Sequence, residues 1–211
     1  MSSKNNKKSV IPMFRHWRIG VDEVGRGALA GPLVVGMFVL YKKIKHPLFS
    51  SFKDSKKTSK KERVRLYELF VKWRHDGLAD FATARISPKL IDKTGLSTCG
   101  RIAVHRLCKR MSLPAKSRIL LDAGLEAPAS YVLQKSIVRG DETIAEIAFA
   151  SIVAKVTRDR EMQRTHRLFP QYHFADNVGY GTLAHRKAVA AFGVCPIHRR
   201  TFLRAYLQSN S

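Results

Sequence analysis

The sequence of residues 17–41 is WRIGVDEVGRGALAGPLVVGMFVLY. It begins with a short apolar segment that ends in two acids, Asp22 and Glu23, and then passes through a glycine-rich turn that closes at Pro32. The run Leu33–Tyr41 is rich in β-branched and aromatic residues, which is typical of a buried strand. Two sequential strands are therefore predicted, with a pair of carboxylates at the end of the first.

Further strands and helices follow along the chain. Strands are predicted at Asp80–Ile86, Arg118–Asp122 and Tyr131–Val138. Helices are predicted at Ser59–Trp73, at Ser87–Met111 with a break near Gly95–Gly100, at residues 142–163, at Ala184–Phe192 and at His198–Tyr206. This order predicts an α/β fold in which helices cover a mixed sheet. Residues 1–16 are expected to form a flexible basic arm, and residues 17–211 a single domain.

The composition points to a polyanionic partner. The chain has 211 residues with 39 Lys and Arg against 16 Asp and Glu, a formal net charge of +23. Nucleic acid is the favoured partner, ahead of an acidic membrane surface, although a merely solvated basic surface is the alternative. Hydrophobic residues make up 45% of the chain, which is enough for a full core and argues against global disorder.

Other classes of protein are disfavoured by what the sequence contains. Three cysteines without a CxxC spacing argue against a disulfide framework and against a thiolate zinc site. The absence of a long apolar run predicts no membrane helix, and the N-terminus has no apolar signal core. We therefore expect a protein of the cytoplasm that does not bind membranes.

Acidic residues are scarce, and several of them stand at predicted strand ends. Asp22 and Glu23 close one strand, Asp122 closes another, and Asp141 follows a third. Ligand sites of α/β sheets gather at such ends. Two like charges ~4 Å apart cost about 4 kcal/mol at an effective dielectric of about 20, and bound cations remove that cost. A carboxylate-only donor set favours Mg²⁺ or Mn²⁺, and two such ions are a common device for phosphodiester cleavage. A turn role for Asp122 and a helix-capping role for Asp141 stay open.

An ordered set of motifs resembles the ribonuclease HII family. The motifs are GVDEVGRGALAGP at 20–32, DSKK at 54–57, LDAG at 121–124, RGD at 139–141, ASIVAKVTRD at 150–159, GYGTLAH at 179–185 and PIHRRTF at 196–202. Together they cover about residues 18–203. The resemblance implies a ribonuclease H-like fold: a five-stranded mixed sheet flanked by helices, with a helical C-terminal part.

The resemblance also implies the chemistry. Asp22, Glu23, Asp122 and Asp141 would be the catalytic, metal-binding carboxylates, with two Mn²⁺ or Mg²⁺ ions when substrate is bound. The implied activity is endonucleolytic cleavage of RNA in RNA–DNA hybrids and 5′ of single ribonucleotides in duplex DNA, which leaves 3′-hydroxyl and 5′-phosphate ends. Removal of ribonucleotides from DNA and processing of RNA primers are the implied roles, and a monomer is expected.

Substrate contacts are expected from three groups of residues. Gly25, Arg26 and Gly27 are suited to reading the ribose 2′-hydroxyl, because glycines let the backbone approach a sugar closely. Tyr180 would pack against the deoxyribose that follows, as the resemblance implies. The candidate phosphate contacts are Lys56, Lys57, Lys155, Arg158, His185, His198 and Arg199, each of which could instead be solvated or paired locally. The two histidines lack a metal-ligand spacing and are expected to form hydrogen bonds.

The chain departs from the family pattern at three places. Ala28 stands where proline is common, Phe149 replaces a small residue, and the segment Ser97–Leu107 differs from the usual Asn- and Ala-rich helix. These departures bear on local packing and substrate contacts rather than on the chemistry.

Two alternatives are weighed against this prediction. Ribonuclease HIII usually carries an additional N-terminal domain, for which the 16 residues before Trp17 leave little room. A non-catalytic basic nucleic-acid-binding protein would fit the charge. However, it would not fit four acids at strand ends, because carboxylates beside a phosphate-binding surface weaken binding unless a metal intervenes.

Overall fold

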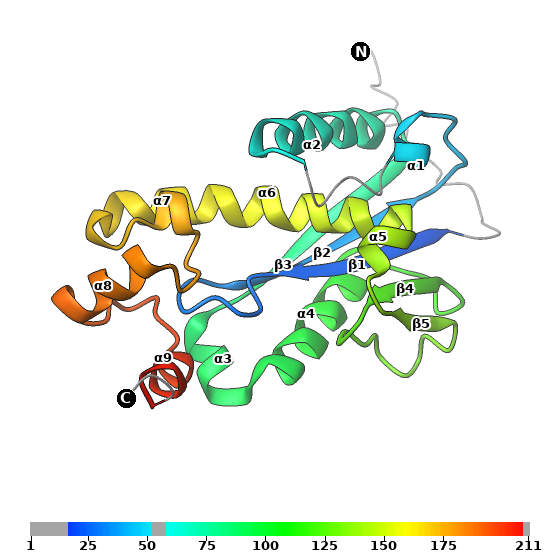
Figure 1. The fold of residues 1–211 in the computed structure, drawn as a ribbon. Coiled ribbons are helices and arrows are strands. Elements are labelled where there is room, and N and C mark those ends of the chain that lie inside the picture. The colour runs from blue at the N-terminus through cyan, green and yellow to red at the C-terminus, as the bar shows by residue number, and fades with distance from the viewer. Residues whose placement is uncertain (1–16, 52–57, 209–211) are drawn as a thin grey trace, which may run out of the picture.

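A five-stranded mixed sheet forms the centre of the molecule (Figure 1). The structure, a computed structural model, describes residues 17–51 and 58–208. The strands lie in the order β3-β2-β1-β4-β5. They span Arg18–Val24 (β1), Leu33–Leu40 (β2), Ala79–Ile86 (β3), Arg118–Asp122 (β4) and Gln134–Ile137 (β5). β2 is antiparallel to β1 and β3, whereas β4 is parallel to β1 and β5, so the predicted mixed sheet is confirmed.

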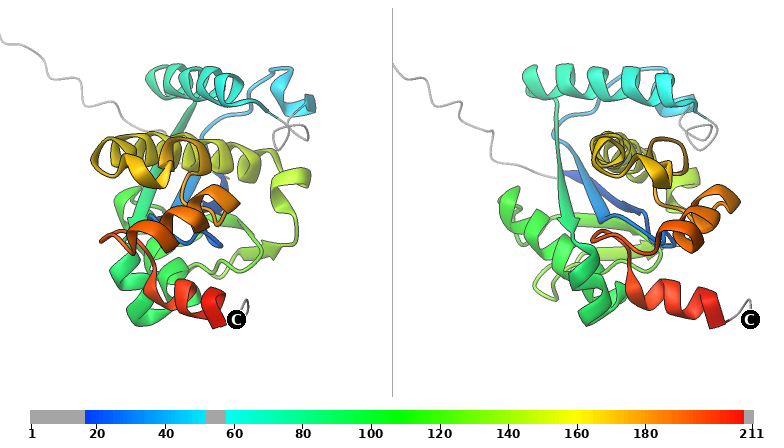
Figure 2. Two further views of the ribbon diagram at one scale, coloured as in Figure 1. Left: turned by 60° about the vertical axis from the view of Figure 1, so that its left-hand side comes forward. Right: turned by 90° about the vertical axis from the view of Figure 1, so that its left-hand side faces the viewer.

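Helices cover both faces of this sheet (Figure 2). The helices on the described chain are α1 (Leu48–Ser51), α2 (Lys60–His75), α3 (Pro88–Thr94), α4 (Leu96–Arg110), α5 (Gly140–Thr143), α6 (Ala145–Leu168), α7 (Phe174–Asn177), α8 (Leu183–Phe192), α9 (Arg200–Gln208) and the 3₁₀ turn η2 (Pro170–Tyr172). α6 crosses β1 and β2 on one face, with α2 beside it, and α4 packs against β2 and β3 on the other. The segments from η2 onward form the helical C-terminal part.

The strand β1 presents different residues to the two faces. Ile19 and Val21 enter the core beneath α4, while Gly20 and Asp22 face α6, as expected from the two-residue period of a strand. A Cβ atom on Gly20 would lie 2.1 Å from the carbonyl carbon of Glu146. α6 therefore rests with its backbone directly on the strand that carries the first acids.

Phe149 fills the space between α6 and α2. Its ring is buried, with its centroid 5.3 Å from that of Phe38 and 5.1 Å from that of Phe70, and Trp73 lies 6.1 Å away. The large side chain at this position thus becomes part of an aromatic cluster that holds α2 against the sheet.

Several predicted boundaries differ from the structure. The helix predicted over residues 142–163 is two helices, α5 and α6, because Ile144 is extended (φ −125°, ψ 116°). By contrast, the break predicted near Gly95–Gly100 within Ser87–Met111 is confirmed, since α3 and α4 are separated at Gly95 (φ 77°). β5 is shorter than predicted, since only its residues facing β4 join the ladder. Ser59 caps α2 as expected, with its hydroxyl accepting a hydrogen bond from the Glu62 amide.

The cysteines and the absence of a long apolar helix from the described residues agree with the sequence, and two predicted segments lie outside those residues. All three cysteines are free and buried, as their odd number predicted. Across residues 17–51 and 58–208, no helix is long and apolar enough to cross a membrane. The predicted N-terminal arm, and the DSKK motif with Lys56 and Lys57, lie outside the described residues.

Because Gly20 lies against the α6 backbone, adding a methyl group at this position should strongly reduce the stability of the fold. Gly20→Ala should lower the free energy of unfolding by at least about 2 kcal/mol, because the helix backbone must move away from the sheet. Gly27→Ala is the matched control, since a Cβ there would meet nothing within 4 Å. Urea denaturation of both variants measures the difference, and equal stability of the two would contradict the close packing.

Candidate active site

Asp22 is a buried carboxylate at the end of β1. Only 5% of its surface is exposed, and its Oδ1 accepts a hydrogen bond of 2.7 Å from the Glu23 amide. Burial, with smaller contributions from the nearby carboxylates of Glu23 and Asp122, raises the pKa of Asp22 to about 7, although the Ser151 hydroxyl on α6 opposes the rise. The side chain is therefore held where its negative charge needs compensation.

Glu23 lies beside Asp22, and only one of its two carboxylate oxygens has a hydrogen-bond partner. Its Oε1 accepts a hydrogen bond of 3.0 Å from Nη1 of Arg26, while Oε2 is buried without a hydrogen-bond partner. Burial raises the pKa of Glu23, and Arg26 opposes that rise. A buried carboxylate oxygen without a donor is costly unless a cation or another ligand satisfies it.

Asp122 and Asp141 are brought to the same edge by the parallel pairing of β1 with β4. The Gly140 amide donates a hydrogen bond of 2.8 Å to Oδ1 of Asp122, which ties the start of α5 to the end of β4. Asp141 follows at once in the first turn of α5 and is buried. The turn role left open for Asp122 is carried by its backbone carbonyl, which accepts from the Leu125 amide and leaves the side chain available.

These acids fit a hard divalent cation in their chemistry. They offer carboxylate oxygens alone, one of them orphaned and one on a group with a strongly raised pKa. No ready-made cluster of three His, Cys, Asp or Glu side chains exists among the described residues. Glu23 instead directs one carboxylate oxygen toward Arg26.

The Gly25–Gly27 turn follows the acids directly. Gly25 has φ +85°, and a Cβ there would lie 2.3 Å from Nε of Arg158, so the turn admits no side chain at this position. Gly27 is exposed, with open space around it, and the Arg26 side chain lies along the backbone of Gly124. The exposed part of the turn therefore borders the carboxylates.

Tyr180 is presented by a second loop, which packs on the first. Its side chain is 38% exposed, and the buried Arg158 guanidinium lies 5.4 Å from the ring centroid. Gly179 allows this approach, since a Cβ there would lie 2.2 Å from the Ala30 carbonyl oxygen. Asn177 shapes the loop: its Oδ1 accepts from the Gly179 amide at 2.8 Å. Sequence reasoning missed Asn177, although an Asn two residues before a glycine is a recognised turn signal.

The predicted phosphate contacts divide into two groups. Lys155 is half-buried on α6 and stays a candidate. The other described candidates are buried side chains bonded within the chain, namely Arg158, His185, His198 and Arg199. Arg158 and His185 are only 1% and 0% exposed, so a phosphate contact from either of them stays a prediction that their burial does not favour. The expectation that the histidines form hydrogen bonds is confirmed.

Comparison with known proteins identifies the family. The family model described as ribonuclease HII matches residues 19–205. The chain belongs to the ribonuclease HII family. Curated ribonuclease HII proteins similar to it include that of Syntrophus aciditrophicus, 42% identical over 87% of this chain and 82% of the relative. That of Campylobacter jejuni subsp. doylei is 36% identical over 96% of this chain and 98% of the relative.

Solved structures agree on the fold. Ribonuclease H2 of Pyrococcus horikoshii superposes with a TM-score of 0.64 at 25% identity, covering 88% of this chain and 93% of that one. RNase HII from Archaeoglobus fulgidus, solved as a complex with PCNA, gives 0.67 at 23% identity over 88% and 93% of the two chains. An RNase HIII solved with Mn²⁺ gives 0.57 at 17% identity and shows the fold alone.

Membership in the ribonuclease HII family makes the chain a ribonuclease H, an endonuclease of the hydrolase class. The family match favours ribonuclease HII over the ribonuclease HIII alternative, and it favours an enzyme over a non-catalytic basic protein.

The raised pKa of Asp22 predicts a pH-dependent stability in protein stripped of divalent cations. Folded Asp22 keeps its proton up to about pH 7, whereas the unfolded side chain loses it near the ordinary value of 3.8. The folded state thus binds more protons in this window, so the contribution of Asp22 to stability falls as pH rises through it. Asp22→Asn, which stays neutral, should be more stable than the wild type by up to about 4 kcal/mol at about pH 8.

Denaturation in a chelator at about pH 5 and about pH 8 measures this difference, with the exposed Asp176→Asn as control. Adding Mn²⁺ should then raise the unfolding midpoint of the wild type more than that of Asp22→Asn. Equal stability of Asp22→Asn and the wild type at the higher pH would show that Asp22 carries no electrostatic cost.

Proposed function

We propose that this ribonuclease HII family member cleaves the RNA strand of RNA–DNA hybrids and cuts 5′ of single ribonucleotides embedded in duplex DNA, leaving 3′-hydroxyl and 5′-phosphate ends. The observation that carries the proposal is the position of the acids. Asp22 and Glu23 lie near the end of β1, Asp122 ends the parallel strand β4, and Asp141 lies in the first turn of α5, which the Gly140 amide ties to Asp122. The turn with the exposed residues Arg26 and Gly27 follows directly after the first two acids.

The four acids would hold Mn²⁺ or Mg²⁺, with two ions in the site when a substrate is bound. Such ions supply an activated water and stabilise the leaving oxygen of a phosphodiester. The chain's own part is to fix the donors in place. The Gly140 amide orients Asp122, and the Glu23 amide orients Asp22. Arg26 holds Glu23, and its partly exposed guanidinium could turn to a substrate phosphate.

Two neighbouring loops would read the sugar. The Gly25–Gly27 turn is suited to the 2′-hydroxyl, since Gly27 leaves open space for a ribose against the backbone. The Tyr180 ring is suited to pack on the deoxyribose that follows, where a second 2′-hydroxyl would crowd it. Lys155, with Lys56 and Lys57 outside the described residues, would contact phosphates.

The biological roles proposed follow from the substrate. Cleavage beside a ribonucleotide begins its removal from DNA, and cleavage of hybrids processes RNA primers. The enzyme would act as a monomer in the cytoplasm, drawn to the duplex by its net charge of +23.

Replacing one carboxylate tests the proposed chemistry. Asp122→Asn should lower cleavage of a duplex with one internal ribonucleotide by at least about two orders of magnitude, or ~3 kcal/mol of barrier. The fold should survive, because the amide oxygen of Asn can still accept from the Gly140 amide. The assay is run with Mg²⁺, with Mn²⁺ and with neither, and thermal unfolding serves as the control. Near-normal cleavage by Asp122→Asn in Mg²⁺ would refute the assignment.

Replacing Tyr180 tests whether its ring contacts the deoxyribose that follows the ribonucleotide. Stacking on a nucleotide is worth ~1–3 kcal/mol, so Tyr180→Ala should slow cleavage at a single ribonucleotide by roughly tenfold or more. An all-RNA strand should suffer less, because there the following sugar already fits the ring poorly. Tyr180→Phe keeps the ring and should retain more activity.

Single-turnover rates of the three enzymes on both substrates provide the measurement. The loop should persist in Tyr180→Ala, since its bonds to Asn177 and His185 use the Tyr180 backbone. An equal slowing of both substrates would mean that Tyr180 has only a structural role.

A further inference from the structure

The segment between α8 and α9 runs alongside the loop that links β1 to β2. The Arg199 amide donates to the Leu29 carbonyl at 2.8 Å, and the Gly31 amide donates to the Ile197 carbonyl at 2.9 Å. Ala30 and His198 form a bridge between these bonds. Residues far apart in the sequence are thus paired like strands, directly behind the Gly25–Gly27 turn.

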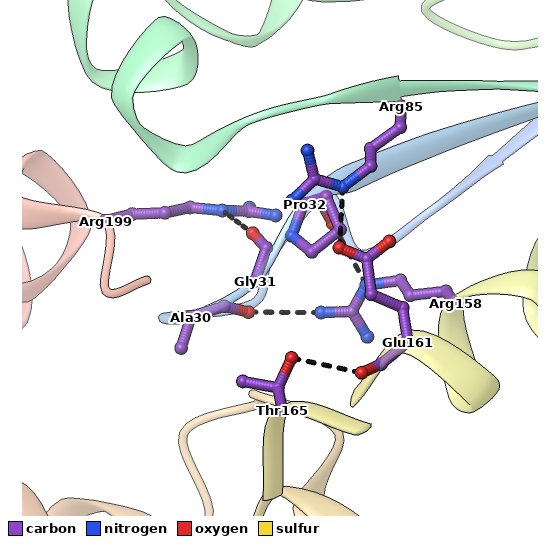
Figure 3. Close-up of polar contacts among 8 residues, drawn as sticks. All are labelled: Ala30, Gly31, Pro32, Arg85, Arg158, Glu161, Thr165 and Arg199. Carbon is purple, nitrogen blue, oxygen red and sulfur yellow. Dashed lines mark hydrogen bonds and ion pairs between the residues drawn. The ribbon is translucent and has the colours of Figure 1, made fainter. Parts of the chain in front are cut away.

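The Arg199 side chain extends this pairing to the turn itself. It is fully buried, and its Nη1 donates to the Arg26 carbonyl at 2.9 Å while its Nε donates to the Gly31 carbonyl at 3.0 Å. Arg158 approaches the same loop from α6 and donates to the Ala30 and Pro32 carbonyls (Figure 3). Two guanidiniums therefore clamp one loop by its carbonyl oxygens.

Because Arg199 is charged and buried, its hydrogen bonds restrict the conformation of the loop. Burial, together with the neighbouring Arg158, lowers the pKa of Arg199 to about 10, so the group is still charged at neutral pH. A buried charge is tolerated only while polar groups compensate it. Any loop conformation that withdraws the Arg26 or Gly31 carbonyl would leave the guanidinium uncompensated, so the turn is held in one conformation.

His198 connects the same segment to Tyr180. His185 Nδ1 lies 2.9 Å from the Tyr180 carbonyl oxygen, which only accepts, so His185 must donate there. Its Nε2 is then an acceptor for His198 Nε2–H at 3.1 Å, and His198 Nδ1 accepts from the Cys195 amide at 2.9 Å. Burial lowers the pKa of both histidines, in keeping with this neutral pair.

We propose that His198 and Arg199 are positioning residues for substrate selection, which fix the Gly25–Gly27 turn and Tyr180 at one mutual spacing. This inference rests on the proposed function. An enzyme that recognises a ribonucleotide followed by a deoxyribonucleotide must contact two successive sugars at once, and an error of ~1 Å in such an arrangement costs up to about a hundredfold in rate. Arg199 sets the first contact, and the His198–His185 pair sets the second.

The test compares two neighbouring arginines. Arg199→Lys keeps the charge but loses the planar fork that joins two carbonyls, whereas Arg200→Lys changes an exposed side chain one residue away. Single-turnover cleavage is measured on a DNA duplex with one internal ribonucleotide and on an all-RNA strand paired with DNA. Arg199→Lys should lower the ratio of the first rate to the second by about tenfold, and Arg200→Lys should leave it unchanged.

A second variant covers the case in which Arg199→Lys fails to fold. His198→Asn places an amide oxygen where Nδ1 accepts from the Cys195 amide, but it removes the donor to His185. It should lower the same ratio while its rate on the all-RNA hybrid stays within about threefold of the wild type. Thermal unfolding and circular dichroism establish that each variant is folded.

The possible results distinguish a wrong proposed function from a wrong role for His198 and Arg199. If wild-type protein fails to cut the duplex with one ribonucleotide, the proposed function is wrong and this inference is wrong with it. If the wild type cuts both substrates and the folded variants lose both rates in equal proportion, the proposed function stands. His198 and Arg199 are then structural residues without a part in selection.

Discussion

The contact between the backbone of α6 and the sheet determines where everything else in this molecule lies. A helix approaches a sheet so closely only where the strands lack side chains on that face, and the chain provides glycines there. Gly25 and Gly31, beyond the strand ends, meet side chains farther along the same helix. The contacts pair Gly20 with Glu146, Gly36 with Ala150, Gly25 with Arg158 and Gly31 with Met162.

The same helix serves both halves of the active site. Its first turns follow Asp141 and place Ser151 beside Asp22, and Arg158, farther along, lies beneath the loop that follows β1. The distance between the acids and the substrate-facing loops is therefore set by a rigid helix rather than by the loops themselves. A fixed spacing of this kind is what the proposed cleavage beside a single ribonucleotide would require.

Charge is distributed unevenly inside the protein. Buried acids gather at the ends of β1 and β4, where burial and mutual repulsion raise the pKa of Asp22. Buried arginines gather behind the adjoining loop, where carbonyl oxygens rather than acids compensate them. Each group costs stability taken alone. The fold supplies carbonyl oxygens to most of the arginine donors, leaving Nη2 of Arg199 without a partner, whereas Oε2 of Glu23 is the unpartnered oxygen among the acids.

The amino-acid sequence alone determined the strands, most helices and the four acids. Alternating or continuous apolar runs are local patterns, and acids are conspicuous in a chain with so few of them. The motif resemblance then named the family that the comparisons confirm. Boundaries such as the break at Ile144 were missed, because the extended conformation there follows from how Gly140 meets Asp122 and not from local preference.

Only the tertiary structure decided which basic residues are buried and which are exposed. On sequence, Arg158, His185 and Lys155 looked alike as candidate phosphate contacts. The fold buries the first two completely and leaves Lys155 partly exposed. The sequence could not separate them, because burial depends on packing between segments that lie more than a hundred residues apart, such as Arg158 and Pro32. Long-range packing of this kind has no local pattern from which it could be predicted.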